Sequence, residues 1–106
     1  MATTLIKFRA SAQRGEIIEI QTAIRHPMET GYRPGADGKI APRDIIRRFT
    51  CHYDGELVFA ADLYPAIAAN PYIAFSTVAT ASGTLRFTWE GDHGFRHTQD
   101  AAISVT

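Results

Sequence analysis

The sequence predicts an all-β protein. Its dominant hydrophobic period is two, which is the spacing of a strand with one buried face. Turn signals that contain glycine, proline or aspartate separate these alternating runs at short intervals. At 106 residues the chain is long enough for one sandwich core, so we expect a single domain over residues 1–106.

The first two strands and a loop come from the N-terminal part. The first strand has three alternating apolar residues on one face, namely Ile6, Phe8 and Ala10. After a turn at residues 14–15, the second strand has Ile18, Ile20 and Ile24 on one face. The loop at residues 24–32 follows, and a glycine-rich turn at residues 34–38 separates it from the next segment.

The middle of the chain predicts a hairpin and a short helical turn. In a strand over residues 45–53, one side carries Phe49, Cys51 and Tyr53, and the other carries Arg48, Thr50 and His52. Asp54-Gly55 is a strong two-residue hairpin signal. It leads to residues 57–61, where Leu57, Phe59 and Ala61 point one way. Residues 64–71 predict a single helical turn that the prolines close.

The C-terminal part completes the sandwich. Residues 72–78 place Ile73 and Phe75 on one side, and residues 84–90 place Leu85, Phe87 and Trp89 inside. A turn at residues 91–94 leads to a last strand that ends near Ile103. About seven short strands with regular turn signals predict an immunoglobulin-like antiparallel β-sandwich.

Composition excludes several classes of function. The formal net charge is +0 and the pI is about 6.9, so no global field favours nucleic acid or an anionic membrane. No apolar run approaches the roughly 20 residues that span a bilayer. The N-terminus alternates like a strand and lacks the hydrophobic block of a signal peptide, so the chain by itself is expected to stay in the cytoplasm.

The sequence contains few arrangements of residues that are typical of catalysis, and we predict that the chain is not an enzyme. Cys51 is the only cysteine, so no internal disulfide forms. Its neighbour His52 points to the opposite face of the predicted strand and cannot readily activate it. Cys51 therefore reads as a thiol of the core, and Cys51→Ser is expected to leave biological activity largely intact.

The four histidines and the cysteine raise the question of a metal site. The string His26-Pro27-Met28-Glu29 and the pair at residues 93–94 resemble superoxide reductases, which hold one iron with four histidines and a cysteine on an immunoglobulin-like fold. In that family a second histidine follows shortly, where this chain has residues 30–33 without one. The family's cysteine falls at Glu90 here. The sequence therefore predicts no metal and no cofactor.

A closer resemblance covers nearly the whole chain. Five strings in order are similar to the Z subunit of the SoxYZ sulfur-carrier complex of thiosulfate-oxidising bacteria. They lie at residues 24–31, 38–43, 54–62, 65–72 and 85–89. Residues 101–106 lack the glycines and the cysteine that end the Y subunit, so the chain resembles the Z partner rather than the carrier arm.

This resemblance implies a non-catalytic subunit of a periplasmic sulfur-carrier complex. The Z subunit pairs with a Y subunit, whose C-terminal cysteine carries sulfur intermediates during thiosulfate or sulfide oxidation, and reaches the periplasm bound to it. Docking with other sulfur-oxidation enzymes follows from the same role. The alternatives are a relative of the mononuclear-iron superoxide reductases and a generic β-sandwich binding or adhesion module.

Five residues are candidates for partner contact: His26, Met28, Glu29, Arg47 and Tyr72. Pro27 stiffens the first three, although His26 also suits an ordinary turn bonded to backbone. The arginines suit either a solvated, salt-bridged face or a patch that contacts anions or partners. Tyr72 shares a face with Ala74 and Val78, which serves either sandwich-end packing or an interface, and self-association of the isolated chain is plausible.

Overall fold

The alternating runs form eight strands in the computed structural model, which describes residues 3–106. The strands are β1 (Thr4–Lys7), β2 (Ser11–Ala12), β3 (Ile17–Ile24), β4 (Ile46–Tyr53), β5 (Glu56–Asp62), β6 (Tyr72–Val78), β7 (Gly83–Gly91) and β8 (Arg96–Val105). A short 3₁₀ turn, η1 (Asp92–Gly94), joins β7 to β8. In the part of the chain that the structure describes, no helix is long and apolar enough to span a membrane.

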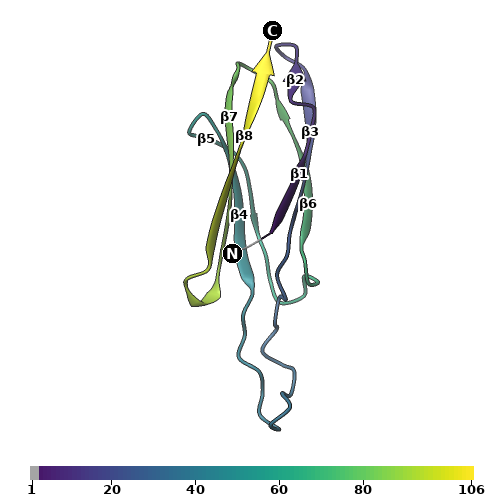
Figure 1. Cartoon of the computed structure of the whole chain (residues 1–106), viewed down its shortest axis with the longest axis vertical. Coiled ribbons are helices and arrows are strands. Elements are labelled where there is room, and N and C mark those ends of the chain that lie inside the picture. Colours follow the sequence, from purple (N-terminus) through teal and green to yellow (C-terminus); the bar gives the residue numbers. More distant parts are fainter. Residues whose placement is uncertain (1–2) are drawn as a thin grey trace.

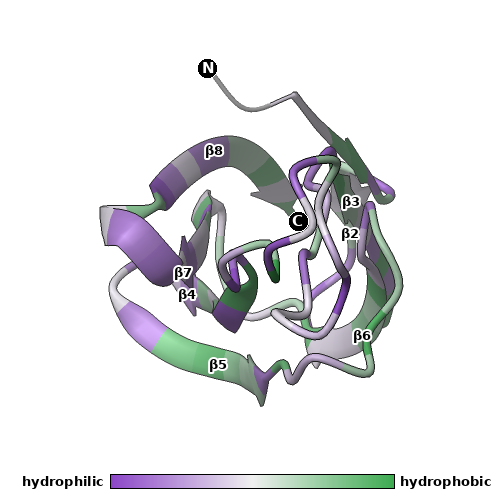
Figure 2. Cartoon of the chain, turned by 90° about the horizontal axis from the view of Figure 1, so that it is seen from below, coloured by the Kyte–Doolittle hydropathy of each residue, from purple (hydrophilic) through white to green (hydrophobic). Residues whose placement is uncertain are grey.

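The strands make two sheets that face each other (Figures 1 and 2). One sheet has three strands in the order β1-β3-β6, all antiparallel. The other has five strands in the order β2-β8-β7-β4-β5. The predicted immunoglobulin-like sandwich is confirmed, with eight strands because the two-residue β2 adds to the seven longer ones.

The chain changes sheets between β1 and β2. β1 pairs antiparallel with β3, whereas β2 pairs in parallel with β8 in the other sheet. The prediction that Ala10 shares a strand face with Ile6 and Phe8 is therefore wrong, since β1 ends at Lys7 and Ala10 is exposed on the crossing. This crossing ties the two sheets together along one side of the sandwich.

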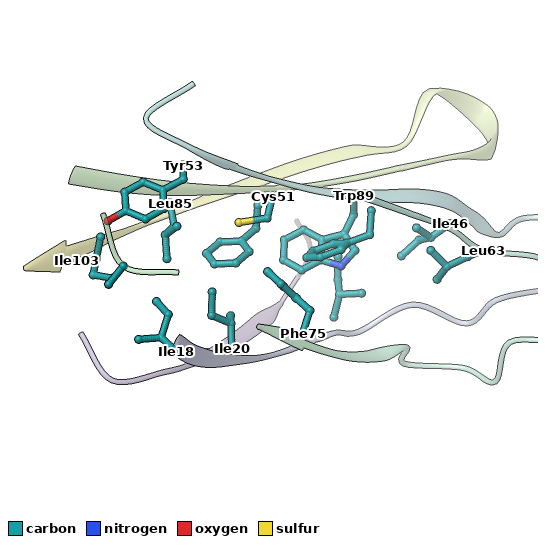
Figure 3. Packing of buried hydrophobic residues seen from close by; sticks show 14 of the residues in the cluster. Ile18, Ile20, Ile46, Cys51, Tyr53, Leu63, Phe75, Leu85, Trp89 and Ile103 are labelled. Carbon is teal, nitrogen blue, oxygen red and sulfur yellow. The ribbon is translucent and has the colours of Figure 1, made fainter. Parts of the chain in front are cut away.

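The core lies between the sheets (Figure 3). Ile18, Ile20 and Phe75 reach in from the three-stranded sheet, and the inner residues of β4 and β7 meet them. Five of those inner residues are fully buried: Phe49, Cys51, Leu85, Phe87 and Trp89. The period-two prediction for these strands is confirmed. Each large apolar side chain buried this way contributes roughly 1.5–3 kcal/mol.

The hairpin at Asp54-Gly55 forms as predicted, but β5 departs from its predicted pattern. Both turn residues have positive φ (47° and 85°), as a two-residue hairpin turn of this hand requires. The register then shifts at a β-bulge, since Cys51 pairs with Phe59 but His52 pairs with Leu57. Leu57 therefore lies on the outer face and is 50% exposed, and the prediction that it points with Phe59 is wrong.

Residues 64–71 form no helical turn, so that prediction is also wrong. The segment makes a tight turn in which the Ile67 N–H donates to the Tyr64 carbonyl at 3.0 Å. Asn70 then takes a left-handed conformation with φ of 55°, and Pro71 has no N–H to continue a helix. Buried Leu63 anchors the start of the segment.

One segment projects beyond the sheets. Residues 25–45, which we call the arm, run out from the end of β3 and return to the start of β4 (Figure 1). The arm makes the molecule long and narrow, with principal extents of 58 × 20 × 19 Å. It is the most prominent feature outside the sandwich and holds most of the residues predicted to meet a partner.

Candidate partner-binding surface

Asn70 fixes the base of the arm. The Asn70 side-chain oxygen accepts the His26 backbone N–H at 3.0 Å, and the Asn70 N–H donates to the His26 carbonyl at 2.7 Å. Because Asn tolerates the left-handed conformation found here, it can turn both groups toward the arm. The β5–β6 connection thus holds the first residue of the His26 turn from both sides.

His26 and Met28 lie inside this turn. The His26 ring nitrogen Nδ1 accepts the Met28 backbone N–H at 3.0 Å, and its ring meets Phe95 edge-on at 5.0 Å between centroids. The Met28 sulfur accepts the Ile46 N–H at 3.2 Å. Exposed fractions are only 5% for His26 and 4% for Met28. Both side chains therefore shape the arm from within.

Burial sets the protonation state of His26. It lowers the pKa of the imidazole, because a charged ring loses more hydration than a neutral one. The carboxylates of Asp44 and Asp92 act in the opposite direction, and Asp44 lies 3.9 Å from Nε2, yet desolvation outweighs both. A neutral ring leaves Nδ1 free to accept from Met28.

The two branches of the arm pair with each other. Glu29 and Asp44 exchange backbone hydrogen bonds of 2.8 Å, and Pro34 faces Ile40 across a second bridge. Gly31 has φ of 87°, and a Cβ built on it would lie 3.0 Å from the Arg43 Cβ. Glycine is therefore required there both for its conformation and for the close approach of the branches.

Asp92 clamps the returning branch to the sandwich. Its carboxylate accepts two hydrogen bonds of 2.8 Å from Arg43, one of 3.2 Å from the Ile45 N–H, and lies 3.1 Å from Arg47. The hydrogen bond from Arg43 is the main reason that the pKa of Asp92 is lowered. His93 adds a ring nitrogen 2.8 Å from the Arg43 carbonyl. The η1 turn thus orients two guanidinium groups.

The tip of the arm exposes apolar groups. Tyr32 is 79% exposed and Ile40 is 58% exposed. Arg33 folds back on Glu29, with a hydrogen bond of 3.0 Å from Nε, and this contact lowers the pKa of the Glu29 carboxyl. An exposed aromatic ring on a paired, braced segment is the kind of anchor that protein interfaces use.

Charge is unevenly distributed along the chain. Residues 25–48 hold six basic and three acidic side chains, while the whole chain has formal net charge +0. The arm and the start of β4 are therefore net basic, and the rest of the molecule is net acidic by the same amount. Such asymmetry orients an approaching partner even when the total charge is zero.

The five predicted contact residues fall into three groups. His26 and Met28 are buried, so neither offers more than a small edge to a partner. Glu29 is paired with Arg33, and Arg47 with Asp92, at the surface of the arm and its root. Tyr72 is 61% exposed on the outer face of β6, in the other sheet from Arg47. Partner contact by these residues stays a prediction.

Tyr72 belongs to an apolar row across the outer face of the three-stranded sheet. The strand registers align Leu5 of β1 with Ala23 of β3 and Ala23 with Tyr72 of β6. Leu5 is 67% exposed. At the other end of the same face, Ile17 pairs with Val78, and both are exposed. This outer face exposes more apolar side chains than a surface that contacts only water normally does.

The candidate metal ligands are dispersed. Cys51 is buried in the core, where desolvation raises the pKa of its thiol to about 12, and His26 is held inside the arm. His52 faces outward on β4, His93 lies in η1 and His97 lies on β8. Across residues 3–106, no three His, Cys, Asp or Glu side chains gather as metal ligands. These residues do not fit the iron of a superoxide reductase.

Sequence reasoning missed two residues that build this surface. Asp92 lies 47 residues from Ile45 in sequence, and Asn70 lies 44 residues from His26. Their role depends on which loops the sandwich brings to one end. The only local signal was for Asn70, since Asn before Pro is typical of a turn.

Comparison with solved structures shows the fold. A superoxide reductase (neelaredoxin) from Ignicoccus hospitalis superposes with a TM-score of 0.71 at 14% identity, covering 98% of this chain and 80% of that one. The sulfur carrier protein SoxY from Chlorobium limicola f. thiosulfatophilum gives a TM-score of 0.67 at 14% identity, covering 97% and 78%. Among curated protein sequences, none matches.

The comparison with protein families is more specific. The model described as sulphur oxidation protein SoxZ matches residues 6–102, which include six of the eight described strands in full, β2 to β7, and part of both β1 and β8. The resemblance found in the sequence is thereby confirmed. This chain belongs to the SoxZ family and is a subunit of the sulfur-oxidation carrier system.

Proposed function

We propose that this chain pairs with a Y subunit, whose C-terminal cysteine carries sulfur intermediates during thiosulfate or sulfide oxidation. The observation that carries this proposal is the family match over residues 6–102. The SoxY structure, which has the same fold, supports it as a partner of similar shape. In this proposal the chain contributes binding surface and geometry, and the sulfur chemistry takes place on the partner's cysteine.

The thiol of this chain suits that division of labour. Cys51 is fully buried, and the raised pKa keeps its thiol protonated at neutral pH. A protonated, sealed thiol is a poor nucleophile and cannot compete with a carrier cysteine for a sulfur intermediate. The chain can therefore remain bound beside the reactive group without exchanging sulfur with it.

The arm supplies a surface on which enzymes of sulfur oxidation dock in this proposal. Its backbone pairing and the clamp at Asp92 hold it in one conformation, so docking costs little conformational entropy. Tyr32 and Ile40 offer apolar contact, and the net basic charge favours an acidic partner. Glu29 lies on this surface and Arg47 lies beside its root at the start of β4, whereas Tyr72 lies on the separate sheet face.

Co-expression tests the pairing. The chain, tagged at its N-terminus, is produced together with a Y subunit from the same organism, and the mass of the purified complex is measured by native mass spectrometry. We expect a stable complex of the two chains, in which the Y cysteine reacts with a thiol reagent and Cys51 does not. Recovery of the tagged chain without the Y subunit, when both are folded and abundant, would refute the pairing.

Surface variants test the docking role. Tyr32→Ala and Arg47→Ala are expected to raise KM for enzymes that act on the loaded complex, with kcat changed less. Arg86→Ala is the matched control, because Arg86 is exposed to a similar degree and is paired with Asp100 on the five-stranded sheet. If Tyr32→Ala and Arg47→Ala changed KM no more than Arg86→Ala does, the arm and its root would not be part of the docking surface.

We also propose that the chain works in the periplasm, where the Y subunit carries it. Fractionation of cells that produce both subunits is expected to place this chain in the periplasm. Deletion of the Y signal peptide should leave both chains in the cytoplasm. Periplasmic recovery of this chain without any Y subunit would contradict export by the partner.

A further inference from the structure

β6 is an edge strand with none of the usual protection against pairing. Within residues 3–106 it pairs with β3 alone, at the end of the order β1-β3-β6. Its seven residues, Tyr72–Val78, contain no charge, no proline and no glycine. Natural edges normally carry lysine, proline or a bulge to prevent association. The pairing of β6 with β3 runs without a register shift, so its backbone is regular along its whole length.

The hydrogen-bonding pattern shows which backbone groups of β6 are free to pair. Ile24 donates to the Pro71 carbonyl and Ala79 donates to the Glu16 carbonyl, so odd-numbered residues bond to β3. Residues alternate in an antiparallel ladder, which turns the N–H and C=O groups of the even-numbered residues outward. These residues are Tyr72, Ala74, Ser76 and Val78.

The other long edge of the molecule differs. β5 (Glu56–Asp62) lies at the end of the five-stranded sheet, and it has acidic residues at both ends and a bulge near its start. Leu63 donates to the Arg47 carbonyl, so the same alternation turns the N–H of Ala60 outward. The bulge and the charges make β5 a poor template, although it offers an alanine in a position equivalent to Ala74.

We propose that β6 pairs antiparallel with β6 of a second copy of this chain, around a two-fold axis at Phe75. In this register Tyr72 lies opposite Val78 of the second copy, and Ala74 lies opposite Ser76 of the second copy. All four outward-facing residues then bond, giving about eight ladder hydrogen bonds between the copies. Moving the axis by one residue loses a bonded pair, so the centred register is favoured.

The side chains of β6 suit this self-pairing. Tyr72 is 61% exposed and Val78 is 46% exposed, and an aromatic residue opposite a β-branched one is a favourable cross-strand pair. No like charges face each other across the axis, since β6 has none. The formal net charge of +0 also leaves no global repulsion between copies at neutral pH. The product is a continuous six-stranded sheet.

Matched proline variants test the proposal. In Ala74→Pro and Ala60→Pro the lost N–H points away from the sheet, so each is compatible with its own edge. Sedimentation velocity of the isolated chain from about 1 µM to about 500 µM should show a concentration-dependent dimer. Ala74→Pro should weaken that dimer by at least about tenfold, and Ala60→Pro should leave it unchanged. Ala74→Lys, with Ala60→Lys as its control, repeats the test if the proline variants unfold.

Amide hydrogen exchange gives an independent readout. Raising the protein concentration should protect the N–H groups of Tyr72, Ala74, Ser76 and Val78, while those of the odd-numbered β6 residues stay as protected as before. Protection at Ala60 instead would place the contact at β5 and overturn the proposal. A chain that stays monomeric over the whole concentration range would also overturn the proposal. If, in addition, the Ala74→Pro variant no longer bound the Y subunit, the β6 edge would be a contact for the Y subunit instead of for a second copy.

Discussion

Cys51 shows how position alone controls the reactivity of a side chain. It lies in the middle of β4, and its side chain points into the space between the two sheets, where it is fully buried (Figure 3). The nearby histidine, His52, points to the other face, as the alternation of the strand predicts. A residue that would be a nucleophile at the surface is therefore a small apolar group here.

We predict that native Cys51 resists thiol reagents. At about pH 8 the folded chain should show almost no reaction with a disulfide reagent over the time in which an exposed cysteine reacts fully, because burial raises the pKa of the thiol to about 12. The chain unfolded in denaturant is the control and should react with one equivalent. Rapid stoichiometric labelling of the folded chain would contradict the buried position.

His26 leads to a prediction about pH. Because burial lowers its pKa below 6.5, the unfolded chain binds this proton more readily than the folded chain. The stability that the neutral ring contributes is complete above the unfolded pKa and is lost as the pH falls below it. The free energy of unfolding should therefore decrease between about pH 7.5 and about pH 5.5.

His26→Asn is the comparison for this pH effect. The Asn side-chain oxygen can accept the Met28 N–H as Nδ1 does, but it does not titrate in this range. Denaturant unfolding of both proteins at the two pH values isolates the contribution of His26, since the other titrating groups are shared. An identical pH dependence in the two proteins would mean that the imidazole does not change its protonation on folding.

At the scale of the elements, the arm is a two-branched segment that depends on a few close contacts. Gly31 and Gly15 provide a matched pair, because both have φ of 87°, but only Gly31 has a neighbour near its absent Cβ. Gly15→Ala should cost about 1 kcal/mol of stability for the left-handed conformation alone. Gly31→Ala should cost more, roughly 1–3 kcal/mol, because Arg43 must also move.

Denaturant titration measures both variants, and amide exchange locates the change. The extra loss in Gly31→Ala should appear as faster exchange at Glu29 and Asp44, whose N–H groups bond across the arm. Equal destabilisation by the two variants would show that the close approach of Gly31 to Arg43 adds no cost in stability.

The elements also show what the sequence can predict. Period-two alternation identified the inner faces of β3, β4, β6 and β7 because one face of each strand is buried and nothing interrupts the register. The prediction for Leu57 failed because a bulge shifts the alternation of β5, and no residue in the sequence indicates this bulge. The arm was predicted only as a loop with a turn, since Asp92 and Asn70 reach it from distant loops.

For the whole molecule, the core is a single layer of side chains shared by both sheets. Phe49 lies at its centre, in contact with Phe59, Phe75, Phe87 and Trp89 through ring-to-ring distances of 5.1–6.3 Å. Phe75 comes from the opposite sheet, so this cluster joins the two layers. The sandwich should therefore unfold as one unit rather than sheet by sheet.

We predict that Phe49→Ala costs about 3–5 kcal/mol. Near- and far-ultraviolet circular dichroism should report the same midpoint in denaturant, because loss of the cluster affects both layers. Tyr32→Ala is the control, since it removes an exposed ring and should change stability by no more than about 0.5 kcal/mol. Separate midpoints for the two signals would show that the packing of the cluster and the strands are lost in different steps, which would contradict unfolding as one unit.

The crossing from β1 to β2 has a consequence for the order of folding. It lets Ser11 pair with Ser104, so this contact closes nearly the whole chain into a loop. Such a closure costs more chain entropy than the local hairpin of β4 and β5, which needs only the Asp54-Gly55 turn. The pairing of β2 with β8 should therefore form last, after the rate-limiting step of folding. Ala12→Gly should then mainly accelerate unfolding, whereas Ala61→Gly should slow folding.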